Sequence, residues 1–279
     1  MADMGKTEVQ ATIEQRVSME IQMQLIEMSK LIPTVTNLSV DAGPGVDTVK
    51  VPRAGDFTVD DKTENTDVTA QVITYATDDL VLNKYKTIQV KLEDNARIQA
   101  KPAVVEDIIS RMSRGLALQV DTDIVAQLEL TSAAAPDHRI AYANATDLGK
   151  ADILEARALL HEQNVPFAEC FIGVSPRSEK ALLAIDDFVH ADKYGSSEGL
   201  RNGELGRLYG ATVIMSNEFD DAKTLVWHPS HAAFAMQQAP LFERDRQVSS
   251  LAWLYSISQL YGTQVMDSGV RGVLLGTAA

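Results

Sequence analysis

The sequence of 279 residues contains a single cysteine, Cys170, so no internal disulfide can form, and one thiol is typical of a reducing compartment. No apolar run is long enough to cross a bilayer, and the segment MADMGKTEVQ lacks the apolar core of a signal peptide. Basic residues are scarce: 25 Lys and Arg against 39 Asp and Glu give a formal net charge of -14, which argues against a dedicated nucleic-acid-binding protein. We therefore expect a protein that is made and folds in a bacterial cytoplasm, without membrane contact.

Motifs for catalysis and cofactor binding are incomplete. The segment GVSPR begins like a nucleophile elbow, but Arg177 occupies the position of the second glycine, so we interpret Ser175 as the cap of a helix. The glycines of GELGRLYG do not have the spacing of a dinucleotide site, and no phosphate-binding loop of the P-loop type is present. These absences predict a protein without catalytic residues or a cofactor.

Candidate metal ligands are also sparse. His228 and His231 flank a proline that prevents a helix from aligning them, and no cysteine or carboxylate lies close by in the sequence. Asp121 and Asp123 fall on a predicted helix, where neighbouring carboxylates are typical of a solvated face. The carboxylates of residues 60–67 lack the spacing and the central glycine of a calcium loop. The sequence therefore predicts no metal site.

The sequence does contain material for a folded domain, with 45% hydrophobic and 23% charged residues. Apolar residues at spacings of three and four predict a helix over residues 7–31, and a rod of about 28 residues after Pro102. The middle of the chain alternates helices with short buried strands, from KADILEARALLHEQN through AECFIGVS and GATVIMS to TLVWH. In the last third, ERDRQ is expected to be a charged turn between apolar segments. These mixed patterns predict an α+β fold.

The most unusual segment is AGDFTVDDKTENTDVTAQ, from Ala54 to Gln71, in which Phe57 is the only aromatic residue. The flanking segments DTVKVPR and YKTIQVKLED alternate polar and apolar residues, which predicts strands. The region should therefore form a long hairpin, with a tip made acidic by Asp60, Asp61, Glu64 and Asp67. A two-stranded hairpin is only marginally stable alone in water, so this arm needs a surface to lie on.

The segment RNGELGRLYGATVIMSNEF, residues 201–219, resembles the late part of tailed-bacteriophage major capsid proteins, which share the Hong Kong 97-type shell fold. The order of elements agrees with this fold over nearly the whole chain: an arm helix, an extended hairpin called the E-loop, a long spine helix and an α/β axial domain. The segments from LVWHPSHAAFAMQQAP to LYGTQVMDSGVRGVLLG resemble the long peripheral-domain strands and the closing axial-domain strand.

The resemblance implies a major capsid protein that assembles into the icosahedral shell around the double-stranded DNA of a tailed phage. An encapsulin-type nanocompartment shell protein is the alternative within the same fold. A cytosolic α+β enzyme, with a site that converges only in three dimensions, is the alternative from another class.

The resemblance also implies a division of the chain. The N-terminal arm covers residues 1–32, and the E-loop covers residues 53–89. The peripheral domain with its spine helix comprises residues 33–52, 90–131 and 223–258. The axial domain comprises residues 132–222 and 259–279, and its loop of residues 186–203 should approach the axis of the capsomer.

In this family the E-loop lies across the adjacent subunit, which would give the polar hairpin its surface. The resemblance therefore implies inter-subunit contacts by the hairpin residues Arg53, Asp60, Asp61, Lys62 and Glu64. It implies a second set of contacts, near the three-fold axes of the shell, by the charged residues Glu243, Arg244, Asp245 and Arg246. A solvated turn is the alternative interpretation of the second set.

The implied partners are first of all other copies of the chain, arranged as hexamers and pentamers. The arm helix begins too early to leave room for a scaffolding extension, so a separate scaffolding protein is expected. The other implied partners are a portal protein, a decoration protein and the packaged DNA. Scattered Lys and Arg would bind this DNA non-specifically. The protein is expected in the capsid of the virion.

Some members of the family join a lysine of the E-loop to an asparagine of a neighbouring subunit. Lys62 lies at the predicted tip of the hairpin, but no asparagine follows Asn217, in the region where the family places the partner. We therefore expect a shell without covalent cross-links.

Overall fold

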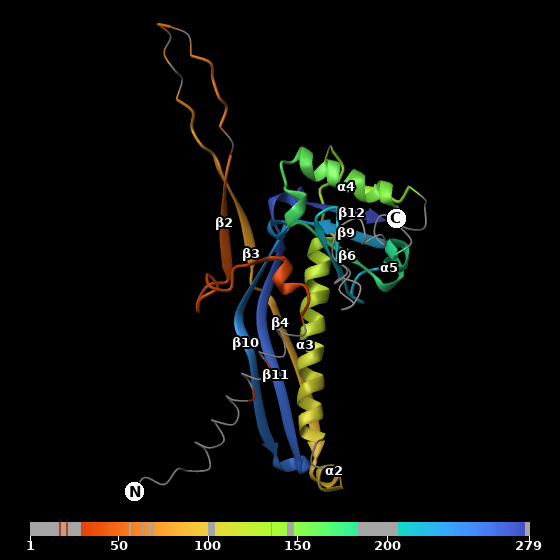
Figure 1. Cartoon of the computed structure of the whole chain (residues 1–279). Coiled ribbons are helices and arrows are strands. Elements are labelled where there is room, and N and C mark those ends of the chain that lie inside the picture. Colours follow the sequence, from red (N-terminus) through yellow and green to blue (C-terminus); the bar gives the residue numbers. More distant parts are fainter. Residues whose placement is uncertain are drawn as a thin grey trace.

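The structure is a computed structural model that describes residues 17, 21, 29–55, 57–62, 64, 65, 67, 70–99, 104–134, 136–143, 148–183 and 206–276. Most of the predicted N-terminal helix and the loop of residues 186–203 lie outside these residues. Within the described residues the predicted α+β class is confirmed, since three sheets and several helices share the chain (Figure 1).

A four-stranded sheet and one long helix form the elongated part of the subunit. The sheet has the order β1-β10-β11-β4, with β1 (Thr36–Asn37), β4 (Lys84–Glu93), β10 (Ala232–Gln247) and β11 (Ala252–Val265). The helix α3 (Val104–Leu128) runs along this sheet in Figure 1. Its buried residues recur at intervals of four and form one apolar stripe: Leu116, Val120, Ile124 and Leu128. The predicted rod is therefore confirmed.

The short helix α2 (Asp94–Gln99) and the turn η5 (Val248–Ser250) lie together at the far end of the elongated part (Figure 1). Elsewhere among the described residues, four further 3-10 turns connect elements: η1 (Ile32–Thr34), η2 (Phe167–Glu169), η4 (Pro229–His231) and η6 (Asp267–Gly269).

A six-stranded sheet forms the second body of the subunit. Its order is β5-β12-β9-β6-β8-β7, with β5 (Arg139–Ala141), β6 (Phe171–Val174), β7 (Arg207–Leu208), β8 (Ala211–Met215), β9 (Lys223–Trp227) and β12 (Gly272–Gly276). The helix α4 (Lys150–Glu162) packs against β12, and α5 (Pro176–Leu183) follows β6. Ile172, Val226 and Val273 are completely buried, so the buried strands predicted here are confirmed.

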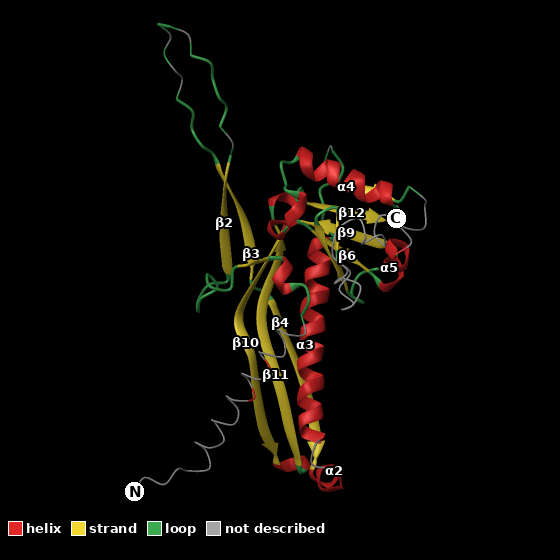
Figure 2. Cartoon of the chain, viewed as in Figure 1, coloured by secondary structure: helices red, strands yellow, loops and turns green. Residues whose placement is uncertain are grey.

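The predicted hairpin projects away from both bodies. Its strands β2 (Thr48–Ala54) and β3 (Tyr75–Val81) form a separate two-stranded antiparallel sheet, and Figure 2 shows the chain beyond them extending outward as loop. At the base, Val49, Leu80 and Leu82 are buried in an apolar cluster with residues of β10. The hairpin is therefore anchored at one end and free at the other.

One glycine allows the base of the hairpin to lie against the long sheet. A Cβ on Gly262 of β11 would lie 2.4 Å from the carbonyl oxygen of Val81 and 3.1 Å from Cδ2 of Leu82. Real Cβ atoms do not approach a backbone oxygen so closely, because the atoms would overlap. The close contact between β3 and β11 therefore depends on the absence of a side chain.

The predicted charged turn at ERDRQ is wrong. Residues 243–247 form the end of β10, where Glu243 pairs with Ser256 and Gln247 pairs with Ala252 of β11. The chain turns at η5 instead. The segment alternates exposed and half-buried side chains as a strand does, but all four leading residues are charged, so hydrophobic periodicity does not reveal it.

The sheets also cross the domain boundaries implied by the resemblance. β9 lies in the six-stranded sheet, although residues 223–258 were expected in the peripheral domain. β11 stays in the four-stranded sheet as far as Val265, although the axial domain was expected from residue 259. Backbone pairing with distant strands determines which sheet β9 and β11 join, and a local sequence pattern does not contain that information.

Candidate functional site

The projecting hairpin carries apolar side chains that enter no core. Their exposed fractions are 64% for Phe57, 94% for Val59, 91% for Val72 and 66% for Tyr75. Phe57 and Val59 are two residues apart, so in an extended chain their side chains lie on the same side. Burial of apolar surface contributes about 25 cal/mol per Å². These side chains therefore offer a contact surface to another molecule.

The side chain of Gln71 holds the two arms of the hairpin together beyond its strands. Its Oε1 accepts a hydrogen bond of 3.0 Å from the N–H of Thr58, and its Nε2 donates one of 2.7 Å to the carbonyl oxygen of Thr58. Nε2 also lies 3.3 Å from Oδ2 of Asp60. The carboxamide thus makes the pair of bonds that an opposite backbone residue makes in an antiparallel ladder. The distal hairpin is extended without a core of its own.

Four of the predicted contact residues lie on this distal part, and all are exposed: Asp60, Asp61, Lys62 and Glu64. With Asp67 they bring four carboxylates and one lysine to the tip. The tip is therefore acidic, and its electrostatic potential favours a basic partner surface.

Arg53 lies apart from the tip, at the base of the hairpin. Its guanidinium forms an ion pair with Asp267 in η6, the turn between β11 and β12. The structure therefore does not bring Arg53 together with the other predicted hairpin residues, and it gives Arg53 a partner within its own chain.

The second predicted set lies at the far end of the four-stranded sheet. Arg246 forms two hydrogen bonds with the carboxylate of Asp94, of 2.6 Å and 2.5 Å. The guanidinium groups of Arg246 and Arg244 lie 5.4 Å and 6.0 Å from the ring centroid of Trp253. Contacts within the chain therefore hold both arginines in place.

The other two residues of this set, Glu243 and Asp245, are exposed. The adjoining turn exposes the apolar side chains of Val248 and Leu251, and α2 exposes Ile98. Leu251 has a φ of 47°, in the left-handed region that residues with a Cβ rarely adopt, where it ends η5. This end of the sheet is a second candidate contact surface, with acidic and apolar groups side by side.

The interpretation of Asp121 and Asp123 as a solvated face is wrong. Asp121 is 3% exposed and accepts hydrogen bonds from Oγ of Ser29 at 2.5 Å and from the N–H of Lys30 at 3.1 Å. Burial raises the pKa of Asp121 above the ordinary carboxyl value, and these hydrogen bonds act in the opposite direction. Asp121 therefore ties the chain before η1 to the long helix.

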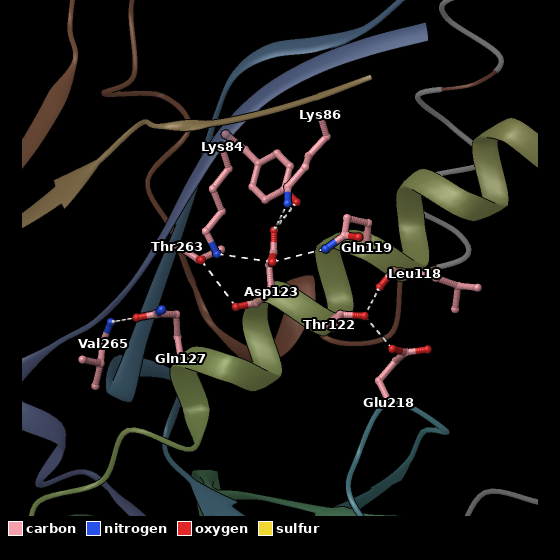
Figure 3. Close-up of polar contacts among 11 residues, drawn as sticks. Lys84, Lys86, Leu118, Gln119, Thr122, Asp123, Gln127, Glu218, Thr263 and Val265 are labelled. Carbon is pink, nitrogen blue, oxygen red and sulfur yellow. Dashed lines mark hydrogen bonds and ion pairs between the residues drawn. The ribbon is translucent and has the colours of Figure 1, made fainter. Parts of the chain in front are cut away.

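Asp123 joins the long helix to two strands of the four-stranded sheet (Figure 3). Its carboxylate oxygens lie 3.6 Å from Nζ of Lys84 and 3.6 Å from Nζ of Lys86, both on β4. Its Oδ2 accepts a hydrogen bond of 2.6 Å from the hydroxyl of Tyr261 on β11. Burial lowers the pKa of Lys84, although Asp123 acts against this shift. Sequence reasoning missed this cluster because its members lie far apart along the chain.

The two histidines of WHPSH have structural contacts. His231 is buried, with Nε2 3.2 Å from the carbonyl oxygen of Leu128 at the end of α3. Nδ1 of His228 lies 2.7 Å from Oγ of Ser230, and its Nε2 lies 3.4 Å from Glu169. The two rings therefore bind different elements and do not form a common site.

Ser175 accepts a hydrogen bond of 3.2 Å from the N–H of Ser178 at the start of α5, so the predicted helix cap is confirmed. Among the described residues, no group of three or more His, Cys, Asp and Glu is arranged to hold a metal ion. The part of the chain that the structure describes also contains no helix long and apolar enough to cross a membrane.

The four-stranded sheet with its long helix, the six-stranded sheet and the projecting hairpin together have the Hong Kong 97-type fold of solved phage capsid structures. Residues 76–273 match the phage capsid protein family, and the chain belongs to this family. A comparison with characterised proteins gave no match.

Solved structures share this fold at low sequence identity. A chain of Mycobacterium phage Che8 is 22% identical with a TM-score of 0.68, over 89% of this chain and 88% of that one. A chain of the capsid of the cyanophage P-SCSP1u is 15% identical with a TM-score of 0.71, over 88% of this chain and 86% of that one. A chain of a virus-like particle from Pyrococcus furiosus is 10% identical with a TM-score of 0.58, over 94% of this chain and 98% of that one.

Family membership and fold together identify a major capsid protein of a tailed phage, a structural protein of the virion shell that self-assembles into capsomers. The nanocompartment and enzyme alternatives are not favoured, since the matching family is that of phage capsid proteins.

Proposed function

We propose that the subunit forms hexamers and pentamers in which each hairpin lies across the neighbouring subunit. The observation that supports this most strongly is the exposure of Phe57, Val59, Val72 and Tyr75 on an otherwise polar arm. An extended arm of this kind can also add backbone hydrogen bonds to the edge of a partner.

The predicted contacts of Asp60, Asp61, Lys62 and Glu64 belong to the same interface. Exposed ion pairs contribute about 0 to 1 kcal/mol each, so these residues select the register of docking more than its strength. The apolar side chains, repeated around each capsomer, supply most of the binding free energy in this proposal. Arg53 contributes indirectly, through its contact at the base of the hairpin.

The far end of the four-stranded sheet is proposed to meet other capsomers near the three-fold axes. Its open groups are Glu243 and Asp245 beside the exposed turn. Arg244 and Arg246 are held by their own chain and act by keeping this end rigid. We propose that α3 and the four-stranded sheet constitute the peripheral domain and that the six-stranded sheet constitutes the axial domain, with residues 1–32 as the arm.

The shell is proposed to enclose double-stranded DNA and to hold it by confinement. A formal net charge of -14 opposes tight binding, so contacts with DNA are few, non-specific and sensitive to salt. A separate scaffolding protein, a portal protein and a decoration protein are the proposed assembly partners, and synthesis takes place in the cytoplasm of the host bacterium.

Deletion of residues 56–72 tests the role of the hairpin. The N–H of Gly55 already donates a hydrogen bond of 3.1 Å to the carbonyl oxygen of Thr74, so the remaining residues can close a short turn between β2 and β3. We expect a soluble subunit with an unchanged circular dichroism spectrum that forms no stable shells in sedimentation and electron microscopy. An unfolded variant would instead show that the hairpin belongs to the subunit's own core.

Point variants separate the apolar contacts from the length of the arm. Phe57→Ser with Val59→Ser should lower the yield of shells, because the buried apolar area at the interface is lost. Val40→Ser is the matched control, since Val40 is 96% exposed and lies outside the hairpin. Equal yields from the hairpin variant and the control would contradict the proposed interface.

A further inference from the structure

The carboxylate of Asp267 contacts segments that are far apart in the sequence. In the turn η6 it forms ion pairs with Arg53 of β2 and with Nε of Arg271, the latter at 3.1 Å. The backbone N–H of Asp267 donates a hydrogen bond of 3.0 Å to Oδ2 of Asp78 on β3. Both strands of the hairpin and the body of the subunit therefore meet at one residue.

These contacts lie where the hairpin leaves the body. Arg53 is one residue from the end of β2, and Asp78 pairs with Val51 on the opposite strand. Toward the body, Val49 and Leu80 are buried in the apolar cluster. Beyond Ala54 the described side chains are almost all exposed. The contacts of Asp267 therefore mark the boundary between the packed and the exposed hairpin.

Apolar packing does not fill this boundary. A cavity of about 220 Å³ lies beside Asp267, and its wall includes the apolar side chains of Leu38, Val51 and Met266. These three side chains belong to the apolar cluster at the base or pack against it, but on the cavity side they lack contact atoms. At this boundary the polar contacts of Asp267 with Arg53 and Asp78 hold the hairpin.

The turn that presents Asp267 is itself seated on the end of the long helix. Asp267, Ser268 and Gly269 have φ angles of 51°, 52° and 76°, in the left-handed region. A Cβ on Gly269 would lie 2.3 Å from the carbonyl oxygen of Leu130, and the N–H of Ser132 donates to the carbonyl oxygen of Gly269 at 3.1 Å. The position of the carboxylate therefore follows that of residues 130–132, which come directly after α3.

On its other side, Asp267 is linked to the second body of the subunit. Nη1 of Arg271, which precedes β12, donates a hydrogen bond of 2.8 Å to Oγ of Ser230. Ser230 in turn lies 2.7 Å from Nδ1 of His228, which follows β9. Polar contacts thus run without a break from the hairpin through Asp267 to the six-stranded sheet.

We propose that Asp267 is a positioning residue, which sets the direction in which residues 55–74 leave the subunit by holding Arg53 and Asp78 against a turn anchored on the segment directly after α3. A hairpin that already has its docking direction loses less conformational freedom on binding, so the contact prepares the subunit for assembly. This consequence for assembly rests on the proposed function. The direction itself is a property of the single subunit and can be measured there.

The test measures the distance between nitroxide labels on cysteines introduced at Thr58 of the hairpin and Glu155 of α4, by double electron-electron resonance on unassembled full-length subunits. Both positions are exposed, whereas the thiol of Cys170 is buried, which raises its pKa to about 12 and keeps it from reacting. Asp267→Asn removes the charge but keeps the backbone N–H and a residue that tolerates the left-handed region. We expect the single narrow distance maximum of the native chain to be lost in this variant.

Arg53→Gln should have the same effect, and Arg53→Lys should restore part of the narrow distribution because it keeps the charge. Asp107→Asn is the matched control, since Asp107 and Arg111 form an exposed ion pair of 2.9 Å within α3. A distribution as narrow as the native one in both Asp267→Asn and Arg53→Gln overturns the proposal, whatever the yield of shells. Failure of the proposed function would appear separately, as normal shells from the hairpin variants in which Asp267 is intact.

Discussion

The hydroxyl of Tyr261 donates a hydrogen bond of 2.6 Å to the carboxylate of Asp123, which joins a strand of the four-stranded sheet to the long helix. The same carboxylate is close to Lys84 and Lys86 of the strand that follows the hairpin. Burial raises the pKa of Tyr261, and the neighbouring carboxylate raises it further, so the hydroxyl remains a donor over the physiological pH range. The helix, the sheet and the strand leaving the hairpin are thus connected through one side chain.

Replacement of Tyr261 by Phe removes this hydrogen bond and keeps the buried ring. A hydrogen bond to a charged acceptor contributes about 1.5–3 kcal/mol, so the free energy of unfolding should fall by about that amount. Urea denaturation of the unassembled subunit measures the change. Tyr85→Phe, at an exposed tyrosine, is the control and should leave the midpoint unchanged. A change at Tyr261 no larger than the change at Tyr85 would show that the contact does not stabilise the fold.

Replacement of Gly262 by Ala should push the end of β3 away from β11, because the added methyl group would overlap the carbonyl oxygen of Val81. Overpacking of this kind typically costs about 1–3 kcal/mol. We expect a lower thermal midpoint and faster hydrogen exchange at the amide of Leu82, which donates to the carbonyl oxygen of Asp47. Gly43→Ala provides the comparison, since no atom lies within 4 Å of a Cβ at Gly43. Equal behaviour of the two variants would refute the argument.

The buried ring of His231 should make the subunit sensitive to acid. Burial lowers the pKa of His231 from 6.5 to about 4, and the charge of nearby His138 acts in the same direction. Between pH 6.5 and 4, His231 is therefore protonated in the unfolded chain and neutral in the folded chain. The contribution of the neutral His231 ring to the free energy of unfolding is fully present above pH 6.5. It is lost as the pH falls through the folded-state pKa of about 4. The full difference corresponds to about 3 kcal/mol.

Urea denaturation at pH 7 and at pH 4.5 checks this dependence. His231→Gln should lose less stability between the two pH values than the native chain, because the variant has no imidazole to protonate. His161→Gln is the control at an exposed histidine and should lose as much as the native chain. If His231→Gln follows the native dependence, another group is responsible.

The mature shell should contain no covalent links between subunits. The chain has no asparagine after Asn217 to react with Lys62. Particles boiled in denaturing detergent should give one band near 30.4 kDa on electrophoresis. A ladder of multiples of that mass would show that another side chain takes the place of the asparagine.

Local patterns in the sequence predict the elements that depend on local forces. The strict alternation of YKTIQVKLED predicts β4, and the spacing of apolar residues after Pro102 predicts α3, because each pattern reflects one face turned to a core. The serine before Pro176 predicts a cap because its bond partner lies three residues away. The exposed tip of the hairpin is predictable from its polar composition.

Contacts between distant segments were not predictable in this way. Asp121 reads as solvated beside Asp123, but its partner Ser29 lies 92 residues earlier in the chain. Asp267 has a local partner in Arg271, but its contacts with Arg53 and Asp78 form only when the hairpin packs on the body of the subunit. The direction of a carboxylate on a helix surface depends on which strand covers it, and one sequence does not specify that strand.

The long antiparallel pair β10 and β11 runs along the same axis as α3. Its inter-strand hydrogen bonds are perpendicular to that axis. A force along this axis that pulls the two strands in opposite directions therefore loads these bonds in shear. Under such shear the bonds from Ala232 to Gln247 carry the load together, whereas a force that peeled the strands apart would break them one after another. The ladder between β10 and β11 thus resists sliding of the strands along the subunit better than it resists peeling.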